Sequence, residues 1–215
     1  MTAEYLWRME QVLDIYERPY DSRFPVVCFD ERPCQLLGDV LMPIPMEPGR
    51  VQRQDYHYKR NGTCVVLMAV EPLVGRRVVK VTERKTKKDY AGYMKALAAS
   101  YPKAEKIILV QDNLNTHNPS SFYEASPADE AFALAQRFEM VYTPKKASWL
   151  NMAEIELSAL SKQCLDRRID KMIVLSSQVM SWTKRRNHLK VTINWNFTKN
   201  KARDKFSRFY NTIIN

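Results

Sequence analysis

Hydrophobic and polar positions change period along the chain, and each period predicts a type of element. Residues 3–18 place apolar side chains at helical spacing, at Leu6, Met9, Val12, Leu13 and Tyr16. A segment bounded by prolines, 19–25, ends this helix. Residues 25–31 then form a short apolar run that closes on an acid, Asp30. We expect a buried strand there.

The next segments have the pattern of a hairpin. Residues 41–50 contain three prolines and a glycine, which predicts an extended loop. Two strand-like runs, 56–60 and 64–70, flank Asn61-Gly62, a dipeptide typical of two-residue hairpin turns. We therefore predict two antiparallel strands joined at this dipeptide, with a third strand over 77–82.

The second half of the chain alternates between helical and strand patterns. Strand-like runs cover 106–110 and 140–142, and helical periodicity covers 87–100, 128–136, 148–165 and 176–186. This order predicts an α/β fold with a mixed central sheet, in which three antiparallel strands precede parallel strands and helices flank the sheet.

Composition and charge narrow the class of protein. The chain has 215 residues, 45% of them hydrophobic, so it can bury a core without disulfides or metal staples. The longest clean apolar run, 64–70, is too short to cross a bilayer, and the first 25 residues carry too many charges for an export signal. We expect a cytoplasmic, nucleoid-associated protein that does not contact the membrane and whose four cysteines are buried thiols.

The net charge of +10 is concentrated near the C-terminus. Residues 184–208 contain nine basic residues and one acid, interleaved with aromatic side chains. This pattern suits a polyanion such as DNA, although a solvated face on a packed helix has the same composition. The candidate DNA-binding residues in this segment are Lys184, Arg185, Arg186, Lys199, Lys201 and Arg203.

Carboxylates end two of the predicted strands. Asp30 follows the first apolar run and Asp112 follows the run at 106–110. A third acid can come from the helix near residue 148, where Glu154 and Glu156 both lie about 80° from the apolar stripe, so periodicity does not choose between them. Three such carboxylates would suit Mg²⁺ or Mn²⁺, and two ions could activate water against a phosphodiester. The alternative for each acid is a structural role at a strand end or helix cap.

Three sequence blocks, taken together, resemble a known family. They are VVCFDE at 26–31, QDNLNTH at 111–117 and TPKKASWLNMAE at 143–154. In this order and spacing they resemble the DDE transposases of the bacterial insertion-sequence branch of the Tc/mariner superfamily. Residues 58–63 and 191–198 are similar to the family's first hairpin and its C-terminal signature.

The resemblance implies an RNase H-like fold and a metal site. Residues 1–24 would be an N-terminal helix and lead-in, 25–187 the catalytic domain, and 188–215 a basic C-terminal segment. Asp30, Asp112 and, through the L-N-x-x-E motif, Glu154 would be the catalytic acids and the ligands of two Mg²⁺ or Mn²⁺ ions.

Other residues in the matching blocks have supporting roles in this interpretation. Asn113 would hold the loop after the second acid, and Asn151 would orient the helix that carries the third. His117 would either brace the same loop or act in the site, by contacting DNA or the attacking water or by orienting a carboxylate. Lys145 and Lys146 would meet DNA phosphates beside the site.

The implied function is metal-dependent cleavage at transposon ends, followed by transfer of the 3′-hydroxyl strand into target DNA. The partners would be double-stranded DNA and a second copy of the chain bound with it. Helix-turn-helix modules usually precede this domain, so we expect them to be missing or separately encoded as an N-terminal half. Two alternatives stay open, namely an inactive or repurposed DNA-binding remnant and a stand-alone RNase H-like nuclease.

Overall fold

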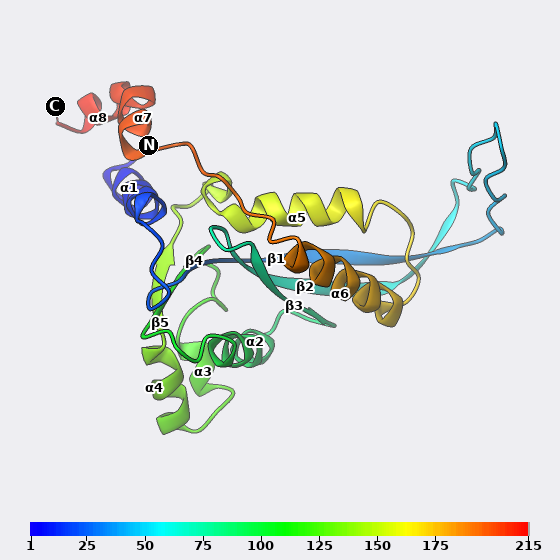
Figure 1. The fold of residues 1–215 in the computed structure, drawn as a ribbon, viewed down its shortest axis with the longest axis horizontal. Coiled ribbons are helices and arrows are strands. Elements are labelled where there is room, and N and C mark those ends of the chain that lie inside the picture. The colour runs from blue at the N-terminus through cyan, green and yellow to red at the C-terminus, as the bar shows by residue number, and fades with distance from the viewer. Residues whose placement is uncertain (215) are drawn as a thin grey trace.

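A five-stranded mixed sheet forms the centre of the molecule (Figure 1). The computed structural model describes residues 1–214. The strands are β1 (Val26–Asp39), β2 (Tyr58–Glu71), β3 (Arg76–Thr82), β4 (Ile107–Gln111) and β5 (Phe138–Tyr142), in the order β3-β2-β1-β4-β5. The first three strands are antiparallel and β4 and β5 run parallel to β1, which confirms the predicted topology.

Helices cover both faces of this sheet (Figure 1). One face carries α2 (Lys87–Ala99), α3 (Ser120–Tyr123) and α4 (Ala128–Gln136). The other carries α1 (Ala3–Glu17), the 3₁₀ turn η1 (Ser148–Leu150), α5 (Met152–Gln163) and α6 (Met172–His188). Two short helices, α7 (Lys199–Lys205) and α8 (Ser207–Ile214), follow near the C-terminus.

Strand alternation decides which side chains face which helices. Val27 and Phe29 of β1 pack with α2, whereas Cys28 between them packs with α1. On β2, Val66 and Met68 pack beneath α5 and α6. Because successive side chains point to opposite faces, two separate hydrophobic layers form, one on each side of the sheet.

The predicted hairpin at Asn61-Gly62 is wrong. Both residues lie inside β2, and the strand that pairs with β2 is β1, which continues to Asp39. Gln35 pairs with Thr63 but Leu37 pairs with Arg60, so β2 carries one extra residue at this point. Gly62 has a φ of 106°, a conformation that glycine adopts readily. The dipeptide therefore builds a β-bulge, not a turn.

The far halves of β1 and β2 form an arm that projects from the body of the molecule (Figure 1). Its tip, residues 40–57, is held by the isolated bridges Ile44–Arg53 and Glu47–Arg50. The tip exposes large apolar side chains, including Met42 at 95% and Met46 at 75%. The extended loop predicted for 41–50 is confirmed, but it lies between two strands that are longer than predicted.

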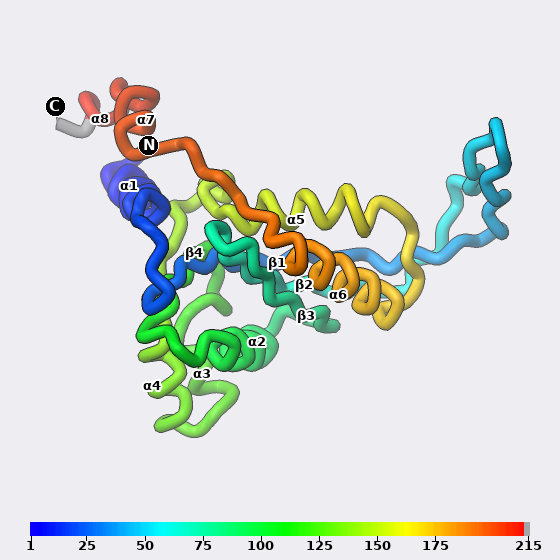
Figure 2. The backbone as a smooth tube through the Cα atoms, in the orientation of Figure 1, coloured from blue at the N-terminus to red at the C-terminus, as the bar shows by residue number. Residues whose placement is uncertain are grey.

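The two ends of the described chain lie together, as Figure 2 shows. Arg203 of α7 donates to Glu10 of α1 at 2.7 and 2.8 Å, and Lys199 pairs with Asp14. The C-terminal helices therefore pack against the N-terminal helix.

The remaining predicted elements are present with shifted ends. The helix predicted at 148–165 is split, because the 3₁₀ turn ends before Asn151, whose side chain caps α5. α6 begins at Met172, four residues earlier than predicted. No helix in the described part of the chain is long and apolar enough to span a membrane. The four cysteines are free, and only Cys34 is half-buried and not fully buried.

Candidate active site

Three acids come from three different elements at one edge of the sheet. Cys28 of β1 pairs in parallel with Val110 of β4, and continuing that register by two residues sets Asp30 beside Asp112. Glu154 lies in the first turn of α5, which packs on the same face of β1. Strand register and helix packing thus bring Asp30, Asp112 and Glu154 to a common edge.

Asp30 is held by contacts that do not neutralise its charge. Its Oδ1 accepts from the backbone N–H of Glu31 at 2.8 Å, and its Oδ2 accepts from Asn151 Nδ2 at 3.3 Å. Burial, together with the charges of Glu154, Glu31 and Asp112, raises the pKa of Asp30 to about 7 despite the backbone hydrogen bond. The repulsion indicates that these carboxylates lie close to one another, with Asp30 the most buried of the three proposed ligands.

Asn151 joins the first acid to the helix of the third. It is buried, its Oδ1 accepts from the N–H of Ala153 at 3.1 Å, and its Nδ2 also donates to the carbonyl of Phe29 at 2.8 Å. One side chain therefore caps α5 and ties its N-terminus to β1 at Phe29 and Asp30.

Asp112 is positioned by a chain of charged groups. His117 Nδ1 lies 2.5 Å from Asp112 Oδ1, and its Nε2 lies 2.9 Å from Glu31 Oε2. Lys85 completes the chain at 3.1 Å from Glu31 Oε1. Burial acts to lower the pKa of His117, but its bonds to Asp112 and Glu31 outweigh burial and raise that pKa to about 9.

The protonated histidine in turn affects its two carboxylates. Burial acts to raise the pKa of Asp112 and of Glu31, but the hydrogen bond and charge of His117 hold both pKa values below their ordinary range. The bonds to Asp112 from His117 and from the Leu114 N–H both use Oδ1, so Oδ2 has no partner among residues 1–214.

The structure separates the two glutamates that periodicity could not. Glu154 is exposed beside the other acids. Glu156 is 0% exposed and accepts hydrogen bonds from Arg77 at 2.9 and 3.0 Å and from Arg186 at 2.5 and 3.1 Å. Its carboxylate therefore forms ion pairs that connect α5 to β3 and to α6.

The donor set suits a hard divalent cation. The three side chains offer only carboxylate oxygens, the ligands that Mg²⁺ and Mn²⁺ prefer. Neither Asp30 nor Glu154 pairs with a lysine or arginine in the described residues, which leaves negative charge for a cation to compensate. No three His, Cys, Asp or Glu side chains in residues 1–214 form a ready-made metal cage. The acids therefore fit the ion chemically, but they are not closed around it.

Lysines border the acids on one side. Lys145 and Lys146 are exposed and line a groove together with Asn113 and with Arg8 of α1. Lys146 has a φ of 63°, an uncommon conformation for a residue other than glycine, in the turn just before η1. The structure thus brings Asn113 beside the two lysines of the third block, whereas His117 and Asn151 contact the acids directly.

The basic C-terminal segment does not form one free cationic surface, contrary to expectation. Arg186 shares Glu156 with Arg77, whereas Lys199 pairs with Asp14 and Arg203 pairs with Glu10. These side chains hold the fold together, because each acid lies on another helix. Of the six basic candidates, Lys184, Arg185 and Lys201 are exposed and form no ion pair in the described residues.

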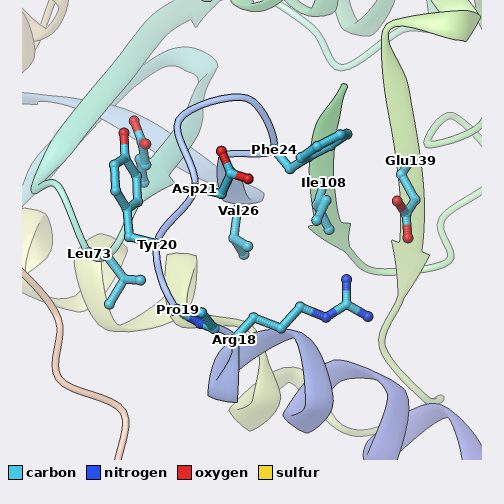
Figure 3. A pocket seen from close by; sticks show the side chains of 10 residues that line it. Arg18, Pro19, Tyr20, Asp21, Phe24, Val26, Leu73, Ile108 and Glu139 are labelled. Atoms are coloured by element: carbon cyan, nitrogen blue, oxygen red, sulfur yellow. The ribbon is translucent and has the colours of Figure 1, made fainter. Parts of the chain in front are cut away.

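An apolar pocket lies elsewhere, at the opposite edge of the sheet (Figure 3). Phe24, Val26 and Ile108 line it, with a volume of about 440 Å³. It contains none of the three acids, so this pocket is not the candidate active site.

Sequence reasoning missed two features of the site. It did not link Lys85 to Glu31 and His117, and it did not find that Arg77 holds Glu156. Both pairs are more than 50 residues apart in sequence, so no local signal identified them.

Comparisons with known proteins agree with this geometry. A family model described as DDE superfamily endonuclease matches residues 25–176. The Mos1 mariner paired end complex with Mn is similar over 89% of this chain and 58% of that chain, with 15% identity and a TM-score of 0.57. The Mos1 Strand Transfer Complex has 14% identity and a TM-score of 0.56 over 89% and 59% of the two chains.

The catalytic domain of Mos1 mariner transposase alone is matched more fully. The similarity covers 89% of this chain and 94% of that domain, with 11% identity and a TM-score of 0.55. The chain thus spans about three fifths of the Mos1 chains in the complexes. No curated protein gives a significant match in sequence.

The predicted RNase H-like fold is therefore confirmed. Because the family model matches well over half of its residues, including all three acids, the chain belongs to the DDE superfamily endonucleases.

Proposed function

We propose that this chain is the catalytic domain of a DDE transposase that cuts DNA at transposon ends and joins the freed 3′-hydroxyl to target DNA. The observation that carries this proposal is the meeting of Asp30, Asp112 and Glu154 at one sheet edge, where neither Asp30 nor Glu154 has a cationic partner among the described residues. Membership of the DDE endonucleases and the likeness to the Mos1 complexes support the same conclusion.

The three acids would hold two Mg²⁺ or Mn²⁺ ions. Bound there, the ions supply an activated water or 3′-hydroxyl and stabilise the leaving oxygen of the phosphodiester. Asn151 donates a hydrogen bond to the Asp30 carboxylate, and the same side chain caps the helix that carries Glu154. His117 fixes Asp112 through Oδ1, and this orientation leaves Oδ2 available to a ligand.

Double-stranded DNA is the substrate in this proposal. Lys145 and Lys146 line one groove with Asn113, the residue after Asp112, and phosphates flanking the cut would lie there. Lys184, Arg185 and Lys201 are further candidate contacts, because their charges are not used within the described chain.

We infer that the arm contacts a second copy of the chain when both are bound to DNA. Its tip exposes Val40, Leu41, Met42, Ile44, Met46, Val51 and Tyr56, each at least 59%. Exposed apolar groups in this density are typical of a protein interface. We expect replacing Met42 and Met46 by serine to abolish dimers in light scattering of the DNA complex while leaving the melting temperature unchanged. A variant that stays dimeric on DNA would exclude this role of the arm.

The test of activity is nicking of supercoiled plasmid in Mn²⁺. We expect nicking by the natural chain and its loss both in Asp112→Asn and in EDTA. An assay that joins a labelled 3′-hydroxyl oligonucleotide to the plasmid then separates a transposase from a stand-alone nuclease, which nicks but does not join. DNA binding with neither product would instead indicate a DNA-binding remnant, and nicking that persists in Asp112→Asn would refute the assignment of the acids.

A further inference from the structure

A polar groove leads away from the acids along α5. It has a volume of about 480 Å³, and Glu154 lies on its wall. Glu31, Arg32 and Pro33 of β1 line one side, where the Glu31 carboxylate is already paired with His117 and Lys85. The other side is formed by residues of α5, namely Leu157, Ser158, Ser161 and Lys162. Because Glu154 belongs both to the acid group and to this groove, anything bound in the groove lies directly beside the proposed reaction centre.

Arg32 has a position that strand geometry dictates. It lies two residues after Asp30 on β1, and its partner across the sheet is Val66, just as Asp30 is opposite Met68. Val66 and Met68 both pack beneath α5 and α6. Since residues two apart on a strand share a face, Arg32 and Asp30 point to the same side of the sheet, toward α5.

The charge of Arg32 is not used within the described chain. Its Nε is buried without a hydrogen-bond acceptor, and its guanidinium forms no ion pair among residues 1–214. Its neighbour is the thiol of Cys34, which is a weak acceptor. A buried guanidinium nitrogen without a partner costs free energy, so the site favours an anionic ligand that brings acceptors.

The opposite wall presents polar side chains at helical spacing, of which Ser158 and Lys162 are free to donate, whereas Ser161 already donates to the carbonyl of Leu157. Glu154, Ser158, Ser161 and Lys162 follow one another at steps of four, three and one residues, which places them along one stripe of α5. Lys162 is exposed and forms no ion pair in the described residues. The stripe rises about 12 Å from Glu154 to Lys162, the length of about three nucleotide steps of one strand.

We propose that this groove binds the sugar-phosphate backbone of the DNA strand as it continues from the scissile bond, with Arg32 and Lys162 each contacting a phosphate. This inference rests on the proposed function and adds to it the path of the strand. An arginine fork can bind two phosphate oxygens at once, and hydroxyls such as that of Ser158 commonly donate to phosphates. The groove is polar and opens at the acids, which favours a nucleic-acid backbone over an apolar peptide.

The test is the salt dependence of DNA binding. Fluorescence anisotropy of a labelled 30-base-pair duplex would be measured in EDTA between 50 and 200 mM salt for the natural chain, Arg32→Gln and Lys162→Gln. The matched control is Lys106→Gln, which removes one exposed charge at the opposite end of β4. Each phosphate contact contributes about 0.9 to the slope of log K against log salt.

We expect each groove variant to reduce the magnitude of that slope by about one. Between 50 and 200 mM salt the natural chain should then lose about three times more of its affinity than the variant does. Lys106→Gln should leave the slope unchanged. Melting temperatures should stay within about 2 °C of the natural value, because Arg32 has no partner to lose. A photo-crosslinking residue at position 158 should also attach to the DNA strand, whereas the same residue at position 106 should not.

The outcomes separate this inference from the proposed function. Unchanged slopes in both groove variants, in a protein that nicks plasmid through Asp112, would overturn the groove and leave the function standing. Lower slopes in a protein whose Asp112→Asn variant still nicks would support the groove and overturn the function. Binding of poly-glutamate that depends on Arg32, with DNA binding that does not, would overturn the groove in favour of an acidic protein.

Discussion

The two glutamates of α5 offer the sharpest comparison, because they lie two residues apart and have opposite predicted roles. Replacing Glu156 by Gln keeps its size but removes its charge. Glu156 has a side chain that is 1% exposed, and Arg77, its main partner, has one that is 0% exposed. The change would leave the charge of Arg77 buried without a counter-ion, because its remaining acceptors are the neutral amide oxygen of the new side chain and the carbonyl oxygens of Gly75 and Val191.

The expected loss follows from the cost of an uncompensated buried charge. Breaking a buried ion pair from one side destabilises a protein by about 3–5 kcal/mol. In a chain of this length each 1 kcal/mol lowers the melting temperature by about 2–4 °C, so Glu156→Gln should melt roughly 6–20 °C lower. Arg186 remains partly exposed and can be solvated, so the cost comes mainly from Arg77.

Glu154→Gln should behave in the opposite way. Glu154 is exposed, so its loss removes a favourable interaction with the N-terminus of α5, about 0.5 kcal/mol, and relieves repulsion of a similar size with Asp30. The free energy of unfolding should change by less than about 1 kcal/mol. Metal-dependent nicking should nevertheless be lost, because the variant removes a proposed ligand.

Two assays on the same samples decide the question. Urea denaturation in EDTA gives the free energies of unfolding, and plasmid nicking in Mn²⁺ at a temperature where both variants are folded gives the activities. We expect Glu154→Gln to be as stable as the natural chain but inactive. We expect Glu156→Gln to be destabilised but still able to nick the plasmid. A stable but inactive Glu156→Gln together with an active Glu154→Gln would refute the assignment of the third acid and of the buried clamp.

Three further predictions concern stability. Asp30→Asn should stabilise the metal-free protein by about 2–4 kcal/mol above pH 7 and by little near pH 4. The folded-state pKa of Asp30 is raised from 3.8 to about 7, so the natural protein loses stability as pH rises through that range. Urea midpoints from pH 4 to 8 in EDTA would check this. His117 has a folded-state pKa raised from 6.5 to about 9, so its contribution of about 3 kcal/mol to the free energy of unfolding is complete below pH 6.5 and lost as pH rises through 9. His117→Gln should remove this pH dependence, and identical pH profiles of stability for the natural chain and the variant would contradict it. Gly75→Ala should destabilise by at least about 2 kcal/mol in urea unfolding, because Gly75 has a φ of 71° and its Cβ would lie 2.5 Å from the carbonyl carbon of Lys190, whereas Gly92→Ala, inside α2 with no atom nearby, should stabilise slightly.

Local sequence was sufficient for most of the secondary structure and for two of the acids. Apolar periodicity located most of the helices and strands, because burial of one face imposes that spacing wherever the element packs. It ended β1 eight residues too early and divided β2 into two strands. Asp30 and Asp112 stood out because each follows a short apolar run that predicts a buried strand, although β1 continues past Asp30 to Asp39 in the structure.

Tertiary structure decided what depends on distant partners. Glu154 and Glu156 lie at about the same angle from the apolar stripe, on opposite flanks of the helix, and only the approach of Arg77 and Arg186 makes Glu156 structural. Asn61-Gly62 carries a turn signal, but pairing of β2 with the long β1 turns it into a bulge. Whether a lysine or arginine has an ion-pair partner is likewise decided by the folded molecule. Arg203 pairs with Glu10, an acid almost the whole chain away, whereas Arg32, two residues after Asp30 on β1, pairs with no acid in the described residues. Charge and periodicity are written in the sequence, but which charges meet is determined by packing.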